Sequence, residues 1–210
     1  MVPRVSQGVT TVVTGTCGVS LARVPPGCPL PQPLDLLGPP ELFRYPTFSA
    51  WMDALREAPA AVNVIPLVGH ASLRVSTMND LQRPATPEEC AGMRRLLAEA
   101  LDAGAFGMST GTFYPPAQHA TTQEIIDIGE TMRGRGGMIY AVHLRDESDR
   151  IDEAMEEALE IGRSLAARVV FSHHKLAGER NHGRSAQTLA RIEEAGAMQP
   201  VCLDCHPYPA

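Results

Sequence analysis

The chain has 210 residues, of which 44% are hydrophobic and 20% are charged, as in an ordinary globular protein. Eighteen basic and 24 acidic residues give a net charge of -6, which argues against nucleic acid as a partner. The sequence has no run near the roughly 20 apolar residues of a membrane span and no pattern typical of a secretion signal. Five cysteines without short disulfide spacing indicate reduced thiols, so we expect a cytoplasmic protein.

Short apolar runs recur along the chain and predict its strands. They are rich in Val, Ile or Ala with little alternation, which is typical of parallel strands buried on both faces. The predicted strands are Val9–Val13, Val62–Val68, Ala105–Ser109, Met138–His143, Arg168–His173 and Pro200–Asp204. The Pro-dense segment 24–40 predicts a long loop after the first strand, on the face where that strand ends.

Amphipathic stretches lie between the later strands and predict helices. Thr86 and Glu89 have the spacing of a capping box, and Thr121 and Glu124 repeat it. Apolar residues then recur at helical spacing over Met93 to Leu101, Ile125 to Met132, Ile151 to Leu165 and Ser185 to Ala195. Strands that alternate with helices predict right-handed βαβ units and an α/β fold with a parallel sheet.

Three possible metal ligands each end a strand-like run. Cys17 follows the first run, His143 ends the fourth and His173 ends the fifth. In a parallel barrel these side chains would converge at the carboxyl ends of the strands, where barrel enzymes carry their chemistry. One thiolate and two imidazoles suit Zn²⁺ and leave a fourth position open for water, which favours metal-assisted hydrolysis.

Each of these residues also has an ordinary structural interpretation. Cys17 could be a small buried hydrophobic residue, and His143 could be a hydrogen-bonded histidine at a strand end. Neighbouring strand residues face opposite sides, so an inward His173 predicts an inward Lys175 and an outward His174. Lys175 could instead be a solvated loop charge.

Other polar residues near the strand ends receive weaker predictions. The segment Arg145 to Glu147 directly follows His143 and is either a solvated cluster or a group that orients the imidazole. Cys202 and Cys205 are predicted to be core residues of a strand rather than a zinc knuckle. The remaining histidines, His70, His119 and His182, are interpreted as loop residues, with His70 able to reach the active face.

At the segments that carry these residues, the chain resembles the N-acyl-D-amino-acid deacylases (D-aminoacylases) of the amidohydrolase superfamily. The segments are GVTTVVTGTCGVS (8–20), GHASLR (69–74), GMSTGTFYPP (107–116), HLRDE (143–147), SHHK (172–175), NHGRS (181–185) and DCHPY (204–208). Each segment is weak singly, but their order and spacing are specific. The resemblance implies a metal-dependent TIM-like barrel that hydrolyses the amide bond of small N-acyl-D-amino acids.

The resemblance also implies roles for single residues. Cys17, His143 and His173 would be the zinc ligands. Lys175 would pair with the substrate carboxylate, and Tyr114 would form part of the pocket wall. His206 stands where the family usually has a tyrosine that helps to bind the carboxylate.

The chain departs from the family pattern at both ends. No His-x-His pair precedes Cys17, and the catalytic Asp of the family is expected beyond Ala210. We therefore expect a single incomplete barrel domain over 1–210, roughly barrel strands two to seven, with little or no activity by itself. Its open sheet edges could pair in a homo-oligomer. Two alternatives are a non-catalytic zinc-binding remnant and a cyclic-amide amidohydrolase, which would need a carboxylated Lys as a ligand.

Overall fold

The computed structural model of the chain describes residues 5–21 and 30–206. Within these ranges every strand is parallel to its neighbours. The strands are β1 (Thr11–Thr14), β2 (Asn63–Pro66), β3 (Val68–Gly69), β4 (Gly107–Gly111), β5 (Ile139–His143), β6 (Arg168–Phe171) and β7 (Val201–Leu203). All six predicted strands are therefore confirmed, with the second one divided in two.

The helices of the described part fill the connections between the strands. The α-helices are α2 (Phe48–Glu57), α3 (His70–Thr77), α4 (Pro87–Asp102), α5 (Thr122–Gly129), α6 (Ile151–Leu165) and α7 (Ser185–Gly196). Short 3-10 helices are η1 (Leu34–Leu37), η2 (Pro40–Phe43), η3 (Glu130–Met132) and η4 (Glu179–Asn181). The four predicted helices are α4 to α7, so helix prediction was correct wherever a long apolar stripe was present.

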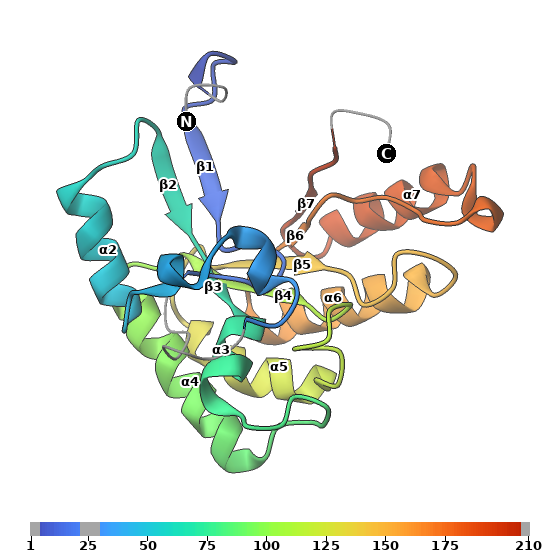
Figure 1. Cartoon of the computed structure of the whole chain (residues 1–210). Helices are drawn as coiled ribbons and strands as arrows, with labels where there is room; N and C mark the ends of the chain where they lie inside the picture. Colours follow the sequence, from blue (N-terminus) through green and yellow to red (C-terminus); the bar gives the residue numbers. More distant parts are fainter. Residues whose placement is uncertain (1–4, 22–29, 207–210) are drawn as a thin grey trace.

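The strands follow one another across the sheet in chain order. β1 pairs with β2, and a second sheet has the order β3-β4-β5-β6-β7. The N–H of Leu67 donates to the carbonyl of Thr14, and the N–H of Phe106 donates to that of Pro66, so the two sheets meet without a gap. Sequential parallel strands with helical connections form an arc of a (β/α) barrel. Figure 1 shows α4, α5 and α6 side by side along one side of this arc.

The hydrophobic core lies between these helices and the sheet. Most of its members come from α4, α5 and α6 on one side and from β4, β5 and β6 on the other. Completely buried residues here include Met93, Leu97, Ile125, Ile128, Met155, Leu165, Val169 and Phe171. Each such side chain contributes about 1.5 to 3 kcal/mol relative to exposure. This core fixes β4, β5 and β6, and with them the positions at which their carboxyl ends lie.

Two helices were not predicted. Thr47 caps α2 by accepting from the N–H of Ala50, a signal that the sequence carries. α3 has no side-chain cap and contains β-branched residues, so its pattern is weak. His70 was predicted to lie in a loop, and this is wrong: it is the first residue of α3 and is completely buried.

The two predicted capping boxes have different outcomes. Thr86 and Glu89 form the complete reciprocal pair at the start of α4. Thr121 accepts from the N–H of Glu124 at the start of α5, as predicted. The Glu124 carboxylate, however, interacts with Arg74 and His70 of α3. A buried cation outside the helix attracts the carboxylate more strongly than the exposed end of its own helix.

Two further predictions concern irregular parts of the chain. Of the predicted loop 24–40, residues 24–29 lie outside the described residues, and residues 30–40 contain 3-10 turns but neither an α-helix nor a strand. Cys202 and Cys205 were predicted to be core residues, and this is wrong because both are exposed. Cys202 lies on β7, which has a paired neighbour on one side only within the described sheet.

Candidate metal centre

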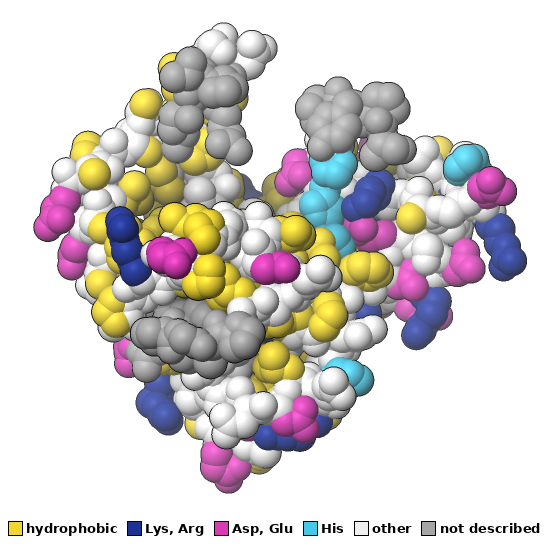
Figure 2. All heavy atoms as spheres, in the orientation of Figure 1, with side chains coloured by type: hydrophobic (Ala, Val, Ile, Leu, Met, Phe, Trp, Pro, Cys, Tyr) yellow, Lys and Arg dark blue, Asp and Glu magenta, His cyan; other side chains and the backbone are white. Residues whose placement is uncertain are grey.

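Cys17, His143 and His173 come together at the carboxyl ends of three strands. Cys17 lies three residues beyond β1, His143 is the last residue of β5, and His173 lies two residues beyond β6. One potential ligand atom from each residue lies within 4.8 Å of the other two. Figure 2 shows histidine side chains, with acidic and basic groups beside them, at the hollow between the arm of β1 and β2 and the arm of β7. The structure thus places the three predicted ligands together.

The distances within this cluster are close to those around a tetrahedral metal ion, although the two nitrogens lie nearer to each other than a metal would hold them. Cys17 Sγ lies 3.3 Å from His173 Nε2, and His143 Nδ1 lies 2.8 Å from the same nitrogen. Tetrahedral zinc bonds of the usual lengths place ligand atoms roughly 3.3 to 3.6 Å apart. Small side-chain shifts would therefore admit a zinc ion, and one thiol with two imidazoles is a donor set that suits it.

The backbone around Cys17 is shaped by close approach to the neighbouring strands. Cys17 has a positive φ of 53° between two glycines that also have positive φ, Gly15 and Gly18. The N–H of Gly18 donates to Ser109 Oγ on β4 at 3.0 Å. A Cβ atom at Gly111 would overlap the carbonyl of Cys17. Glycine at these positions lets the loop after β1 lie directly against β4, which brings the thiol to the histidines.

Lys175 lies beside the cluster with Glu147, a carboxylate for which the sequence left two interpretations open. The Lys175 Nζ atom lies 2.5 Å from the Glu147 carboxylate and 3.1 Å from His173 Nδ1. Glu147 is only 11% exposed, so it is not a solvated charge. His174 points away and contacts Thr188 Oγ1 of α7 at 2.9 Å. The predicted orientations of residues 173 to 175 are confirmed.

The two other predicted substrate-binding residues also lie at the cluster. The Tyr114 ring lies 4.7 Å from that of His143 between centroids, and its hydroxyl is 3.4 Å from His143 Nδ1. The exposed His206 ring lies 5.7 Å from the His173 ring. Both residues therefore lie beside the candidate histidine ligands.

The sequence did not predict one contact beside the cluster, made by Asp204. The Asp204 carboxylate accepts from the N–H of His173 at 2.7 Å, and its carbonyl accepts from the N–H of His174. Asp204 thus fixes the backbone of the loop after β6, where His173 has a positive φ of 40°. Its place at the end of the next strand was the available signal. His119 and His182 are exposed, in agreement with their interpretation as loop residues.

The pKa values of His143 and His173 are shifted in opposite directions. Burial lowers the pKa of His143 to about 4, so its imidazole is neutral at pH 7. Hydrogen bonds to Cys17 and Glu147 raise the pKa of His173 to about 9. Burial raises the pKa of Glu147, but the hydrogen bonds of His173 and Lys175 outweigh it and lower the pKa overall. Metal binding would therefore displace a proton from His173.

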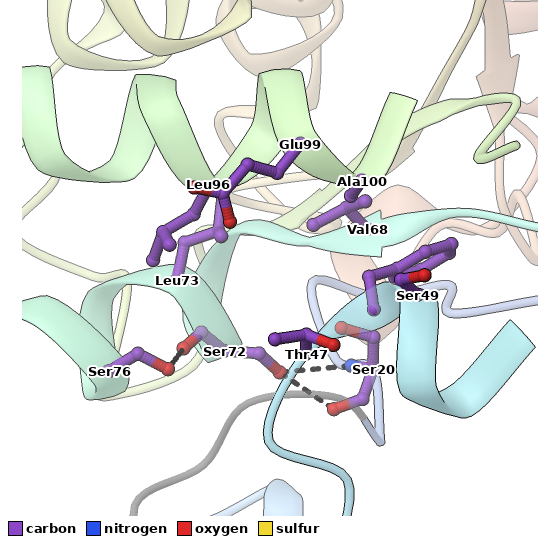
Figure 3. A pocket seen from close by; sticks show the side chains of 11 residues that line it. Ser20, Thr47, Ser49, Val68, Ser72, Leu73, Ser76, Leu96, Glu99 and Ala100 are labelled. Atoms are coloured by element: carbon purple, nitrogen blue, oxygen red, sulfur yellow. Dashed lines mark hydrogen bonds between the residues drawn. The ribbon is translucent and has the colours of Figure 1, made fainter. Parts of the chain in front are cut away.

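An apolar pocket lies elsewhere, between α2, α3 and α4. Figure 3 shows Leu73, Leu96 and Val68 on its wall, with a hydrogen-bonded group of serines at one side. Ser72 Oγ donates to the carbonyl of Ser20 and accepts from its N–H. None of the three candidate ligands lines this pocket, so its chemistry is separate from that of the cluster.

Comparison with curated proteins finds relatives along the full chain. The chain is 69% identical over 210 residues to an N-acyl-D-aspartate deacylase and 54% identical over 210 residues to a D-aminoacylase, both from Alcaligenes xylosoxydans xylosoxydans. An N-acyl-D-glutamate deacylase from the same organism is 39% identical over 98% of the chain. The chain spans 42%, 43% and 42% of the lengths of these three relatives. No protein-family model matches the chain.

Solved structures show the same relationship. A crystal structure of D-aminoacylase, described as defining a novel subset of amidohydrolases, matches with a TM-score of 0.94 and 52% identity. A Bordetella bronchiseptica N-acyl-D-glutamate deacylase in complex with zinc and a phosphonate inhibitor matches with a TM-score of 0.90 and 40% identity. Each match covers 98% of this chain and 43% of the other. Among the described residues, no helix is long and apolar enough to cross a membrane.

Proposed function

Because the chain belongs to the N-acyl-D-amino-acid deacylase family of the amidohydrolase superfamily, we propose that it carries the zinc site of an enzyme that hydrolyses N-acyl-D-amino acids. The products would be a carboxylate and a free D-amino acid. The single observation that carries the proposal is the convergence of Cys17, His143 and His173 at the carboxyl ends of their strands. A zinc-bound relative of the same fold supports the choice of metal.

The chain's own residues would hold the metal and place the substrate beside it. Cys17 would bind through Sγ, His143 through Nδ1 and His173 through Nε2, because these atoms face one another. Zinc bound there supplies a Lewis acid for the scissile carbonyl and a site at which water becomes more acidic. Three protein ligands leave a coordination position for water or substrate, as in other catalytic zinc sites.

Three further residues would orient the substrate. The Lys175 ammonium would pair with the substrate carboxylate, and Tyr114 would pack against the substrate beside His143. His206 would add a contact to the same carboxylate, since its ring lies against that of His173. A charge anchor to one side of the metal favours one stereoisomer, because only that isomer then presents its carbonyl to the zinc.

We propose that the described carboxylates near the cluster do not act as the proton-transfer group. The carboxylates near the cluster already have structural partners there: Glu147 pairs with Lys175, and Asp204 holds the backbone of His173. We infer that the general base is the family's aspartate, which lies outside the described residues. Zinc binding is therefore proposed for the 210 residues themselves, and turnover for a chain that includes this aspartate.

The proposal is tested by metal content, measured by elemental analysis on the purified chain. We expect about one zinc per chain, lost in C17A and H143A and retained in H119A, a matched control in which an exposed loop histidine is removed. Amine release from N-acetyl-D-amino acids with Asp, Glu or Met side chains, with the L-isomers as controls, tests the activity in a chain that includes the remaining barrel. A folded 210-residue chain without zinc would overturn the proposal.

Sheet edges suggest an additional proposal about assembly. β1 and β7 stand at the two ends of the described arc, and each has one hydrogen-bonded neighbour. Unpaired strand edges recruit other strands. We propose that the 210-residue chain by itself forms homo-oligomers through these edges, and that sedimentation measurements will show a concentration-dependent mass. A monomer at all concentrations would contradict this proposal.

A further inference from the structure

Glu147 contacts both candidate imidazole ligands from the side opposite the thiol. Its carboxylate lies 3.2 Å from His173 Nδ1 and 3.6 Å from His143 Nε2. These are the two ring nitrogens that do not face the cluster, because His143 Nδ1 and His173 Nε2 lie 2.8 Å apart on the other side. A single carboxylate therefore meets the outward nitrogen of each histidine.

This geometry selects which nitrogen of each ring keeps its proton when a metal is bound. A neutral imidazole has one N–H donor and one lone pair, and the partner of the donor decides which nitrogen can bind a metal. A carboxylate only accepts, so it favours the proton on His143 Nε2 and on His173 Nδ1. The Lys175 ammonium, which only donates, also lies 3.1 Å from His173 Nδ1, but it is held at 2.5 Å by the same carboxylate. The lone pairs then lie on His143 Nδ1 and His173 Nε2, the two nitrogens that face each other within the cluster that includes Cys17 Sγ. The arrangement corresponds to the carboxylate–histidine–zinc relationship, with one carboxylate shared by two ligands.

Glu147 also holds the proposed substrate anchor. Its other contact is with Lys175 Nζ at 2.5 Å, and the Lys175 side chain is 37% exposed while the carboxylate is 11% exposed. The carboxylate thus joins the metal cluster to the partly exposed ammonium in front of it. Its backbone position follows from β5, because residue 147 lies four positions after His143 in the loop that leaves the strand.

We propose that Glu147 is a positioning residue that fixes the tautomers of His143 and His173 for metal binding and places Lys175 for the substrate carboxylate. This inference rests on the proposed function, since it requires a metal at the cluster. Residues at such positions affect the metal through its ligands, and their replacement typically costs about 10- to 100-fold in metal affinity.

Zinc affinity of the 210-residue chain, measured by competition with a chromogenic chelator, tests the inference. We expect E147Q to lower zinc affinity about 10- to 100-fold, because its amide can present a donor toward a ring nitrogen that must itself donate. The matched control is E153Q, which removes an exposed carboxylate that pairs with Arg150.

A second readout separates positioning from simple structural support. We expect the visible absorption of the Co²⁺-substituted protein to change in E147Q, while the urea midpoint of the metal-free protein changes little. If the wild-type chain binds zinc and E147Q has the same zinc affinity and the same Co²⁺ spectrum, the proposed role of Glu147 is overturned while the proposed function stands. A loss of unfolding free energy in E147Q that is the same with and without metal would also overturn this role. A wild-type chain that binds no zinc would overturn the proposed function, and the inference with it.

Discussion

Arg74 of α3 and Glu124 of α5 form an ion pair that is almost completely excluded from water, with side chains 0% and 2% exposed. Their remaining polar atoms are also bonded: Arg74 donates to the carbonyls of Pro116, Leu81 and Arg83, and Glu124 accepts from the N–H of Ala85 and contacts His70. The pair thereby joins two helices to the segment that precedes α4 and to the turn after β4, which carries Tyr114.

We expect R74M and E124Q each to lower the free energy of unfolding by about 3 to 5 kcal/mol, because each leaves a buried charge without its partner. Urea unfolding followed by circular dichroism measures the loss. D53N is the control, since Asp53 pairs with Arg56 in an exposed bridge of the kind that contributes little. Losses as small as that of the control would contradict a charged pair at this position.

The same pair predicts a pH dependence. Burial raises the pKa of Glu124, but the contacts with His70, Ala85 and Arg74 outweigh it and lower the pKa from 4.5 to about 2. A depressed pKa contributes stability that is fully present above the unfolded value of 4.5 and is lost as the pH falls toward 2. The difference in unfolding free energy between wild type and E124Q should therefore shrink from pH 5 to pH 2. A difference that stays constant over this range would refute the assignment.

Metal removal should destabilise the chain. A ligand that binds only the folded state adds about 2.7 kcal/mol when its free concentration is a hundred times its dissociation constant. Calorimetry with zinc and with a chelator should show a higher melting temperature with zinc. In C17S the two melting temperatures should coincide, and a persistent difference would place the stabilising zinc at another site.

The glycine before the candidate thiolate offers a matched pair of substitutions. Gly15 and Gly134 both have a φ of 78°, so alanine at either position costs about 1 to 2 kcal/mol for the left-handed backbone. A Cβ at Gly134 meets no atom within 4 Å, whereas a Cβ at Gly15 would overlap the backbone carbonyl of Leu67. We expect G15A to be clearly less stable than G134A and to bind zinc more weakly. Chemical denaturation and chelator competition on both variants measure the difference, and equal values would show that β1 can move away from Leu67.

Much of the fold could be predicted because its signals are local. Buried parallel strands appear as short apolar runs, and α4 begins with a capping box that the structure contains. α3 could not be predicted in this way, because Gly69 supplies no side-chain cap and burial against the sheet stabilises the helix. Tertiary packing here outweighs a weak helical pattern.

In the candidate site, too, the residues with local sequence signals could be predicted and those that depend on tertiary contacts could not. Cys17, His143 and His173 could be predicted because each follows a strand and barrel strands converge at their carboxyl ends. For Glu147 the sequence left open whether it is solvated or orients an imidazole. Its contact with both rings depends on the path of the loop after β5, which the sequence does not indicate. The contact of Glu124 with Arg74 spans 50 residues of sequence, and the pattern around Thr121 indicated a different partner.

The contact between Cys17 and His173 spans 156 positions of the chain. A metal bound to both would close a loop that holds most of the protein, and closing a flexible loop of that length costs about 4.5 kcal/mol in chain entropy. During synthesis the thiol leaves the ribosome long before the second imidazole exists. The zinc site can therefore form only after the six strands β1 to β6 have been made, so metal capture would follow the early steps of folding rather than guide them.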